Sequence, residues 1–274
     1  MSRLILFLLL CGAFSSHART LFIDLNNARE EIEALAAGAP GEIVVVPSLA
    51  RINRDARKRV LAANMKLEKL FEASHACAGG KPPRDVDCAT VYEQIRAAEL
   101  ARLAITGDYN EHDLLAELSE ISDRPAQKPF DMLVISGHHE LGSFRGELTQ
   151  LEFTRFLGVV QSLPSLFSSV NTVVLLGCET GTREMFTQQL APMFPEVALI
   201  VGAEAKAPVR NDARNLSFIR KFDQSRKALL KARTVKQAEQ VYDRMGTQSW
   251  PVSLLWRQKT LFFKKTVETL APIQ

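Results

Sequence analysis

Three short, almost wholly apolar runs separated by helical sequence constrain the fold of this chain more than any other feature. The runs are "DMLVISG", "NTVVLLG" and "EVALIVGA", and they begin at residues 131, 171 and 196. Near-continuous apolar strands of this kind are typical of a parallel sheet that is buried on both faces. Because helical periodicity separates them, the β-α-β-α-β order predicts a doubly wound, mostly parallel α/β sheet.

The segments around these strands predict further elements of the same sheet. Residues 21–50 read as the opening of an α/β unit, with a helix followed by the strand "GEIVVVPS". Thr149 and Glu152 have the spacing of a capping box for the helix after the first strand, and Thr182 is a possible cap for the next one. Near the C-terminus, "SWPVSLLW" predicts an edge strand or a capping segment, because proline cannot donate to a central ladder.

A long helical segment interrupts the α/β pattern. Residues 52–122 carry helical periodicity, with two longer helices and a shorter acidic one, "EHDLLAELSEI". The expected organisation is therefore a signal peptide (1–18), the start of the α/β unit (19–50), a helical hairpin region (51–125) and the α/β core (126–274).

The first residues have the pattern of a secretory signal. Arg3 precedes the apolar run "LILFLLL", and "SSHA" provides a small-residue cleavage site that ends at Ala18. The apolar run is shorter than the roughly 20 residues of a membrane span. We therefore expect an exported protein, periplasmic or secreted, without a membrane span.

The cysteines fit an oxidising compartment. Cleavage of the signal would remove Cys11 and leave Cys77, Cys88 and Cys178. The first two flank a short polar loop between the predicted helices, so a disulfide that staples a helical hairpin is expected, with two free thiols as the alternative. Cys178 is left without a partner.

The charge balance and the histidines exclude several function classes. The chain has 34 basic and 31 acidic residues and a formal charge of +3, which indicates neither a nucleic-acid partner nor a membrane surface. His139 and Glu140 begin like a zinc-protease motif, but Ser143 stands where the second histidine is required. We expect no metal and no cofactor.

Candidate catalytic residues follow the ends of two predicted strands. His138 and His139 follow the first strand, and Cys178 follows the next one along the chain. In doubly wound sheets, sites form outside the carboxyl ends of the strands. If these strands are neighbours, an imidazole can take the proton of the thiol, whose ordinary pKa is about 8.5.

A strand that ends in "SGH", followed by a strand that ends in "GCETG", resembles the caspase-like cysteine peptidases, and most closely their CHAT-type branch, over about residues 131–240. The resemblance implies that Cys178 is the nucleophile and His138 the general base or acid. It also implies that the backbone N–H groups of His139 and Cys178 form an oxyanion hole. The family usually has glycine after the catalytic histidine, whereas this chain has His139.

Some assignments stay open at the level of the sequence. Which imidazole faces the sulfur is undecided, although the position after "SG" favours His138. Glu179 and Asp212 are secondary candidates that could supply a charge. Leu176 stands where relatives that cleave after Arg or Lys often have an acid, so that particular pocket for basic residues is not expected.

Two function classes follow from this pattern. The first is an exported cysteine endopeptidase with a Cys/His dyad, acting by acyl transfer on a protein or peptide substrate. The second is a catalytically inactive caspase-like fold that serves as a protein-interaction module, with the stapled hairpin as a docking surface. His139 in place of glycine favours the second class.

Overall fold

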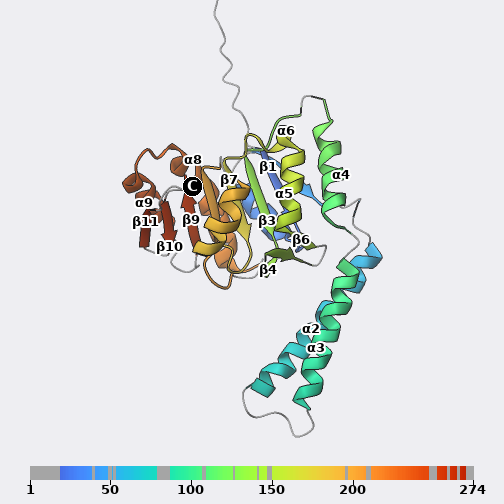
Figure 1. The fold of residues 1–274 in the computed structure, drawn as a ribbon. Helices are drawn as coiled ribbons and strands as arrows, with labels where there is room; N and C mark the ends of the chain where they lie inside the picture. The colour runs from blue at the N-terminus through green and yellow to red at the C-terminus, as the bar shows by residue number, and fades with distance from the viewer. Residues whose placement is uncertain are drawn as a thin grey trace, which may run out of the picture.

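The computed structural model describes residues 19–38, 41–48, 51, 54–78, 87–106, 109–125, 127–140, 142–146, 150–194, 197–207, 211–246, 252–257, 260–263 and 266–269. The predicted signal segment lies outside them. An eight-stranded sheet of order β11-β10-β9-β8-β7-β3-β1-β2 forms the centre of the body (Figure 1). Its strands are β1 (Arg19–Asp24), β2 (Glu42–Val46), β3 (Met132–Ser136), β7 (Thr172–Leu176), β8 (Leu199–Ala203), β9 (Val252–Trp256), β10 (Thr260–Phe263) and β11 (Thr266–Thr269).

The sheet is mostly parallel, as the apolar runs predict. Strands β2, β1, β3, β7 and β8 pair in parallel, and β9, β10 and β11 extend the sheet in antiparallel fashion. The prediction of an edge strand near the C-terminus is wrong, because β9 lies between β8 and β10. Strand β9 begins at Val252, after Pro251, so every residue of the strand retains a ladder donor.

Helices cover both faces of this sheet, which makes it doubly wound. One face packs against α1 (Arg29–Gly38), α8 (Ala213–Lys231) and α9 (Val235–Arg244). The other packs against α4 (Glu111–Ser122), α5 (Phe153–Ser162), α6 (Pro164–Phe167), the π-helix η1 (Met185–Leu190) and α7 (Ala191–Met193). Alternate residues of a strand pack into the hydrophobic cores on opposite faces of the sheet. Val134 packs toward α1 and α8, and Ile135 packs toward α4 and α5.

The segment after β3 differs from the sequence prediction. A three-stranded antiparallel sheet forms from β4 (His138–Glu140), β5 (Ser143–Arg145) and β6 (Gln150–Glu152). The capping-box prediction is therefore wrong: Glu152 ends β6 and α5 begins only at Phe153, while Thr149 lies outside the described residues. Thr182, in contrast, acts as a cap, because its hydroxyl accepts a hydrogen bond from the Met185 N–H at 3.3 Å.

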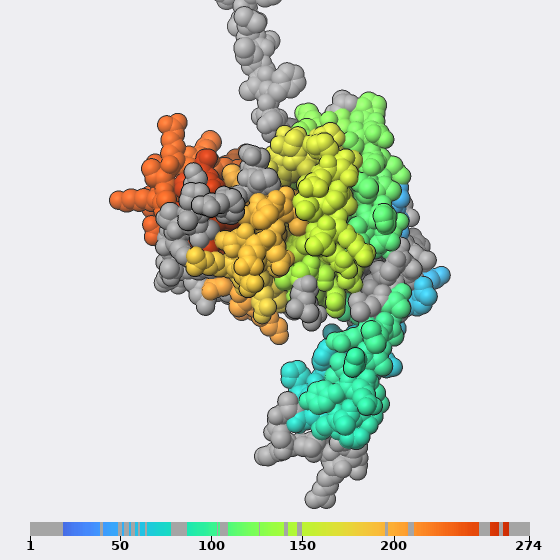
Figure 2. Space-filling model, in the orientation of Figure 1, coloured from blue at the N-terminus to red at the C-terminus, as the bar shows by residue number. Residues whose placement is uncertain are grey.

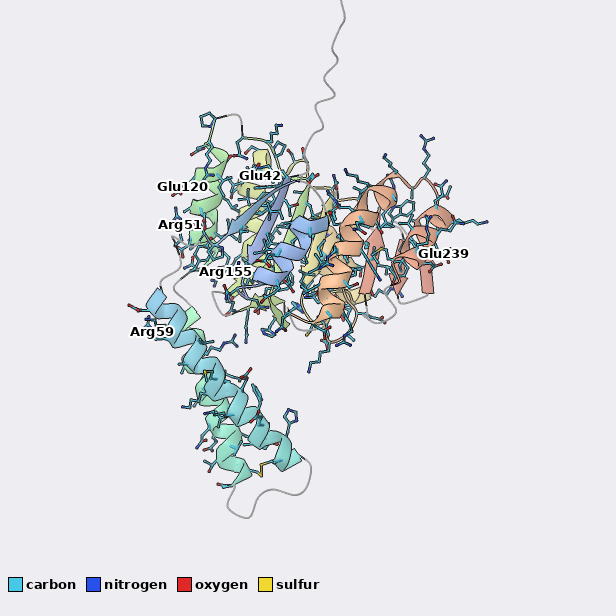
Figure 3. The ribbon with its side chains drawn as sticks, turned by 180° about the vertical axis from the view of Figure 1, so that it is seen from behind. Glu42, Arg51, Arg59, Glu120, Arg155 and Glu239 are labelled. Carbon is cyan, nitrogen blue, oxygen red and sulfur yellow. A yellow bond between two sulfur atoms is a disulfide. The ribbon has the colours of Figure 1, made fainter. Side chains whose placement is uncertain are left out.

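The helical insertion projects from the body as an arm. Its helices α2 (Arg54–Ala78) and α3 (Cys88–Thr106) lie between β2 and β3 in the sequence and extend away from the sheet (Figures 1 and 2). The predicted disulfide between Cys77 and Cys88 is confirmed, with 5.8 Å between the Cα atoms, and it joins the helices at the far tip of the arm (Figure 3). Among the described side chains, a small apolar cluster around Leu67, Val91 and Ile95 packs between the two helices.

The base of the arm is held by α4. Glu117 on α4 accepts a hydrogen bond from the Ser48 N–H at 2.9 Å and from the Tyr109 hydroxyl at 2.7 Å. Burial, with the neighbouring Glu117 carboxylate, raises the pKa of the Tyr109 hydroxyl. Arg51 and Glu120 form an ion pair beside them (Figure 3). None of the helices in the described part of the chain combines the length and the apolarity that a membrane crossing requires.

Candidate active site

Strands β3 and β7 are direct neighbours, as the proposed site requires. They pair in parallel up to Ser136 and Leu176, and the Gly137 N–H donates to the Leu176 carbonyl at 3.3 Å. His138 and Cys178 each follow two residues after the last paired position of their strand. The chain segments that carry the imidazoles and the thiol therefore leave the same edge of the sheet side by side.

Cys178 is a free, half-buried cysteine on a turn that Thr180 ties to the sheet. The Thr180 side chain is fully buried. Its hydroxyl lies 3.0 Å from the Gly177 carbonyl and 3.2 Å from the Leu175 carbonyl, and it accepts the Ala203 N–H at 3.2 Å. The threonine of the "CETG" sequence thus ties the turn to β7 and to the neighbouring β8.

The glycine of the same sequence is required by close packing. A Cβ atom on Gly181 would lie 2.4 Å from the Gly202 carbonyl oxygen, and one on Gly202 would lie 2.6 Å from the Thr180 carbonyl carbon. The Gly181 N–H donates to the Ala203 carbonyl at 2.7 Å across this contact. Two backbones therefore meet where no side chain fits, and this contact fixes the height of the turn above the sheet.

His139 contacts the residue that carries the thiol. Its Nδ1 atom lies 2.9 Å from the Cys178 carbonyl oxygen. Since a carbonyl oxygen only accepts, Nδ1 carries the proton in this hydrogen bond. The imidazole ring packs at centroid distances of 5.4 Å from Phe144 and 5.8 Å from Phe153. Gly177 makes room for this arrangement, because a Cβ atom there would lie 2.6 Å from the Phe144 ring.

The two histidines point to opposite faces of the small sheet. His138 pairs with Arg145, and His139 pairs with Phe144, across β4 and β5. Adjacent residues of a strand project to opposite faces, and directly paired residues share a face. His139 accordingly points into the core with Phe144, and His138 is exposed on the other face with Arg145. The part that each imidazole plays toward the sulfur remains a prediction.

The secondary candidates, Glu179 and Asp212, lie in different parts of the fold. Glu179 is exposed and adopts a left-handed backbone conformation (φ +56°), and its N–H donates to the Ala205 carbonyl at 3.0 Å. Asp212 is the N-cap of α8: its carboxylate accepts the Arg214 N–H at 2.7 Å and pairs with the Arg214 guanidinium at 2.7 Å. The hydrogen bonds from Arg214 lower the pKa of Asp212. A helix-capping role therefore accounts for Asp212.

A buried carboxylate next to the site is not visible in the sequence pattern. Glu31 on α1 is 2% exposed and accepts a hydrogen bond from the Ser136 hydroxyl at 2.5 Å and another from the Asn215 side-chain amide. Ser136 is the last residue of β3, so Glu31 ties the end of that strand to α1 and α8. In the sequence, Glu31 has the signature of an ordinary acid in the first turn of a helix, and only the fold shows its burial.

Comparisons with known proteins do not assign this chain to a family. No protein-family model matches the sequence, and no curated protein is significantly similar to it. Among solved structures, a secreted C11 cysteine protease from Bacteroides thetaiotaomicron, in complex with an irreversible peptide inhibitor, aligns at a TM-score of 0.35 and 8% identity. The alignment covers 56% of this chain and 46% of that chain, less than half of its length.

Proposed function

We propose that this protein is a cysteine peptidase with Cys178 as its nucleophile and His138 as its general base and acid. The observation that carries the proposal is the placement of a half-buried free cysteine at the end of β7, beside the histidine-bearing end of β3. Structural free cysteines are usually buried. Cys178 instead lies on a turn that Thr180 and Gly181 hold at the edge of the sheet.

The chemistry is an acyl transfer in two steps. The Cys178 thiol gives its proton to the imidazole, and the sulfur forms a bond to the carbonyl carbon of the scissile peptide. The C–N bond then breaks, the leaving amine takes the proton from the imidazolium, and a thioester remains. Water next attacks the thioester and gives a proton to the imidazole, which returns it to the departing sulfur. The products are an amine and a carboxylic acid, and the enzyme is regenerated.

The finer assignments are part of the same proposal. The "SGH" and "GCETG" sequences support a caspase-like enzyme of the CHAT type, with the backbone N–H groups of His139 and Cys178 as oxyanion donors. The disulfide between Cys77 and Cys88 and the signal-like N-terminal sequence support an exported enzyme that acts on protein or peptide substrates. We expect the reaction to need neither a metal nor a cofactor.

Alkylation of Cys178 tests the proposed dyad directly. At about pH 6, iodoacetamide should label Cys178 in the wild-type protein much faster than a model thiol, because the neighbouring imidazole stabilises the thiolate. His138→Ala should slow labelling at least about tenfold, and His139→Ala should slow it less, with Cys178→Ala as the unlabelled control. Equally slow labelling of the wild type and His138→Ala would overturn the dyad. A peptide-library screen against the Cys178→Ala control would then test cleavage.

A second candidate is a non-catalytic interaction module. Among the described residues, the large apolar side chains that are exposed all lie on the projecting helices α2 and α3: Leu61, Met65, Phe71, Tyr92 and Leu100. Apolar surface gathered on one projecting element marks an interaction site more often than apolar residues scattered singly. The presence of His139 in place of glycine favours the same candidate, because its imidazole binds the Cys178 carbonyl and packs against Phe144 and Phe153, which is a structural role.

Two measurements together favour or remove this candidate. Slow labelling of Cys178, unchanged by His138→Ala, would favour the module over the enzyme. Leu61→Glu with Leu100→Glu should lower the binding of an apolar dye such as ANS, and it should change the free energy of unfolding by no more than about 0.5 kcal/mol because both side chains are exposed. Unchanged dye binding would show that the arm offers no apolar docking surface.

A further inference from the structure

Four exposed side chains form a stripe along α2, and we call it the α2 stripe. Lys58, Leu61, Met65 and Glu68 follow one another at intervals of three, four and three residues. At 3.6 residues per turn, these four positions lie within about 80° of one another around the helix axis. Leu61 is 51% exposed and Met65 is 54% exposed. The stripe therefore has an apolar centre, with an ammonium group at one end and a carboxylate at the other.

The α2 stripe does not belong to the core of the arm. Leu67 is the residue of α2 that is buried between the helices, where it packs against Val91 and Ile95 of α3. It lies about 140° around the helix axis from the middle of the stripe. The arm itself stands clear of the body (Figures 1 and 3). The stripe thus faces away from α3, and a second molecule can reach it.

The spacing of the stripe is that of a helix that packs against another helix. Alternating intervals of three and four residues define the a and d positions of a heptad, whose side chains insert between those of a partner helix. A partner for this stripe needs apolar side chains opposite Leu61 and Met65, an acid opposite Lys58 and a base opposite Glu68. The α2 helix itself meets all of these requirements when its direction is reversed.

A second copy of α2 in antiparallel orientation matches the stripe at each position. When Leu61 lies opposite the partner's Met65, a two-fold axis repeats this contact with the roles exchanged. The same register sets Lys58 opposite the partner's Glu68, again twice. Parallel pairing would instead set Lys58 against the partner's Lys58 and Glu68 against the partner's Glu68, which are contacts between like charges. The charge pattern therefore selects the antiparallel pair.

A second pair of charges fits the same register. Asp55 and Lys69 are exposed and flank the stripe on one side of α2. In the antiparallel pair, Asp55 lies beside the partner's Lys69. Within one copy, Asp55 is 3.9 Å from Lys58, and the two side chains are 87% and 81% exposed. An ion pair as exposed as this one contributes little, so both residues can turn to a partner.

We propose that two copies of this protein associate through α2 as an antiparallel, two-fold symmetric pair, with Leu61 of each copy packed against the partner's Met65. The interface is small, so we expect a weak dimer with a dissociation constant on the order of 10 μM. The proposal does not depend on the proposed peptidase function, because Cys178 takes no part in the interface. Alkylation of Cys178 and association of the protein can therefore succeed or fail independently.

Analytical ultracentrifugation of the purified protein measures the association. At low salt, the wild type should pass from monomer to dimer as its concentration rises from about 1 to 200 μM. Leu61→Ser with Met65→Ser should raise the dissociation constant at least about tenfold. Leu100→Ser is the matched control, because Leu100 is a similarly exposed apolar residue on α3, and it should leave the constant unchanged. A wild type that stays monomeric throughout this range would overturn the proposal, and so would a dimer that survives the double substitution.

Reversal of single charges tests the register of the pair. Lys58→Glu and Glu68→Lys should each raise the dissociation constant at least about tenfold, because like charges then face one another. An equimolar mixture of the two variants should dimerise again, since each helix supplies the charges that the other lacks, and this recovery shows that both variants are folded. Lys66→Glu, at an exposed position on another side of α2, should have no effect. A mixture that stays monomeric would contradict the register.

Disulfide trapping distinguishes antiparallel from parallel pairing. In a Cys178→Ala background, the Lys58→Cys protein mixed with the Glu68→Cys protein should form a cross-linked dimer under mild oxidation, because these two positions face each other. The Lys58→Cys protein alone should not cross-link, because the two copies of position 58 lie far apart in an antiparallel pair. Cross-linking of the Lys58→Cys protein alone would show parallel pairing and overturn the proposed arrangement.

Discussion

The Nδ1 atom of His139 lies 2.9 Å from the carbonyl oxygen of Cys178, which is 39 residues further along the chain. This hydrogen bond ties the strand after β3 to the turn after β7. The imidazole is therefore fixed by the backbone of the thiol residue on one side and by two phenylalanine rings on the other. We infer that His139 positions the Cys178 turn and that the exposed His138 is the base.

Substitution of His139 separates its hydrogen bond from its packing. His139→Phe keeps a ring against Phe144 and Phe153 and should lower the free energy of unfolding by about 1 kcal/mol through the lost hydrogen bond. His139→Ala also removes the ring and should cost roughly 2 kcal/mol in total. Denaturant unfolding measures both. Equal stability of the two variants would show that the ring contacts contribute nothing.

The tautomer of His139 gives a spectroscopic test of the same bond. Because the Cys178 carbonyl can only accept, Nδ1 must carry a proton in the neutral imidazole. Nitrogen NMR of the ring should show the Nδ1–H tautomer for His139. A spectrum with the proton on Nε2 alone would contradict the hydrogen bond.

Thr180→Val tests whether the Cys178 turn is held by the buried hydroxyl. Valine has a similar shape but leaves the Ala203 N–H, which donates to the hydroxyl at 3.2 Å, without its acceptor. The free energy of unfolding should fall by about 1–3 kcal/mol. Thr187→Val is the matched control, because the Thr187 hydroxyl bonds the Arg183 carbonyl at an exposed position, and it should change stability by less than about 0.5 kcal/mol.

Two glycines should respond to alanine in opposite directions. Gly181→Ala would place a Cβ atom 2.4 Å from the Gly202 carbonyl oxygen, so the backbones must separate at a cost of about 1–3 kcal/mol. Gly158 lies within α5, and a Cβ atom there would meet nothing within 4 Å. Gly158→Ala should therefore stabilise the protein by about 0.5–1 kcal/mol. Thermal unfolding of both variants decides this, and a stabilised Gly181→Ala protein would refute the close contact.

The disulfide should stabilise the arm and leave the sheet unaffected. Cys77 and Cys88 are 11 residues apart, and closing a loop of this length contributes about 3 kcal/mol in the chain-entropy model. Cys77→Ser with Cys88→Ser should therefore accelerate hydrogen exchange in α2 and α3, whose shared core is small. Exchange in β3 and β7 serves as the internal control. Faster exchange there as well would show that the arm is part of the cooperative core.

The sequence predicts the buried parallel strands β2, β3, β7 and β8 and the longer helices, because each depends on local periodicity. The runs that became β3, β7 and β8 are apolar along their whole length, and the helices of the arm carry a clear helical period. The errors occur where pairing between distant segments overrides a local signal. Thr149 and Glu152 have the spacing of a helix start, yet Gln150–Glu152 forms β6 because it pairs with β5. In the same way, β9 is an interior strand because β10 pairs with its outer edge.

By itself, the sequence determined the α/β class, the stapled hairpin and the position of one unpartnered thiol after an apolar strand, since these follow from residues close together along the chain. Only the tertiary structure decided that β3 and β7 are neighbours and that His139, and not His138, binds the Cys178 carbonyl. The pairing of β4 with β5 sends adjacent histidines to opposite faces. Such a choice depends on contacts between distant segments, which local sequence patterns do not contain.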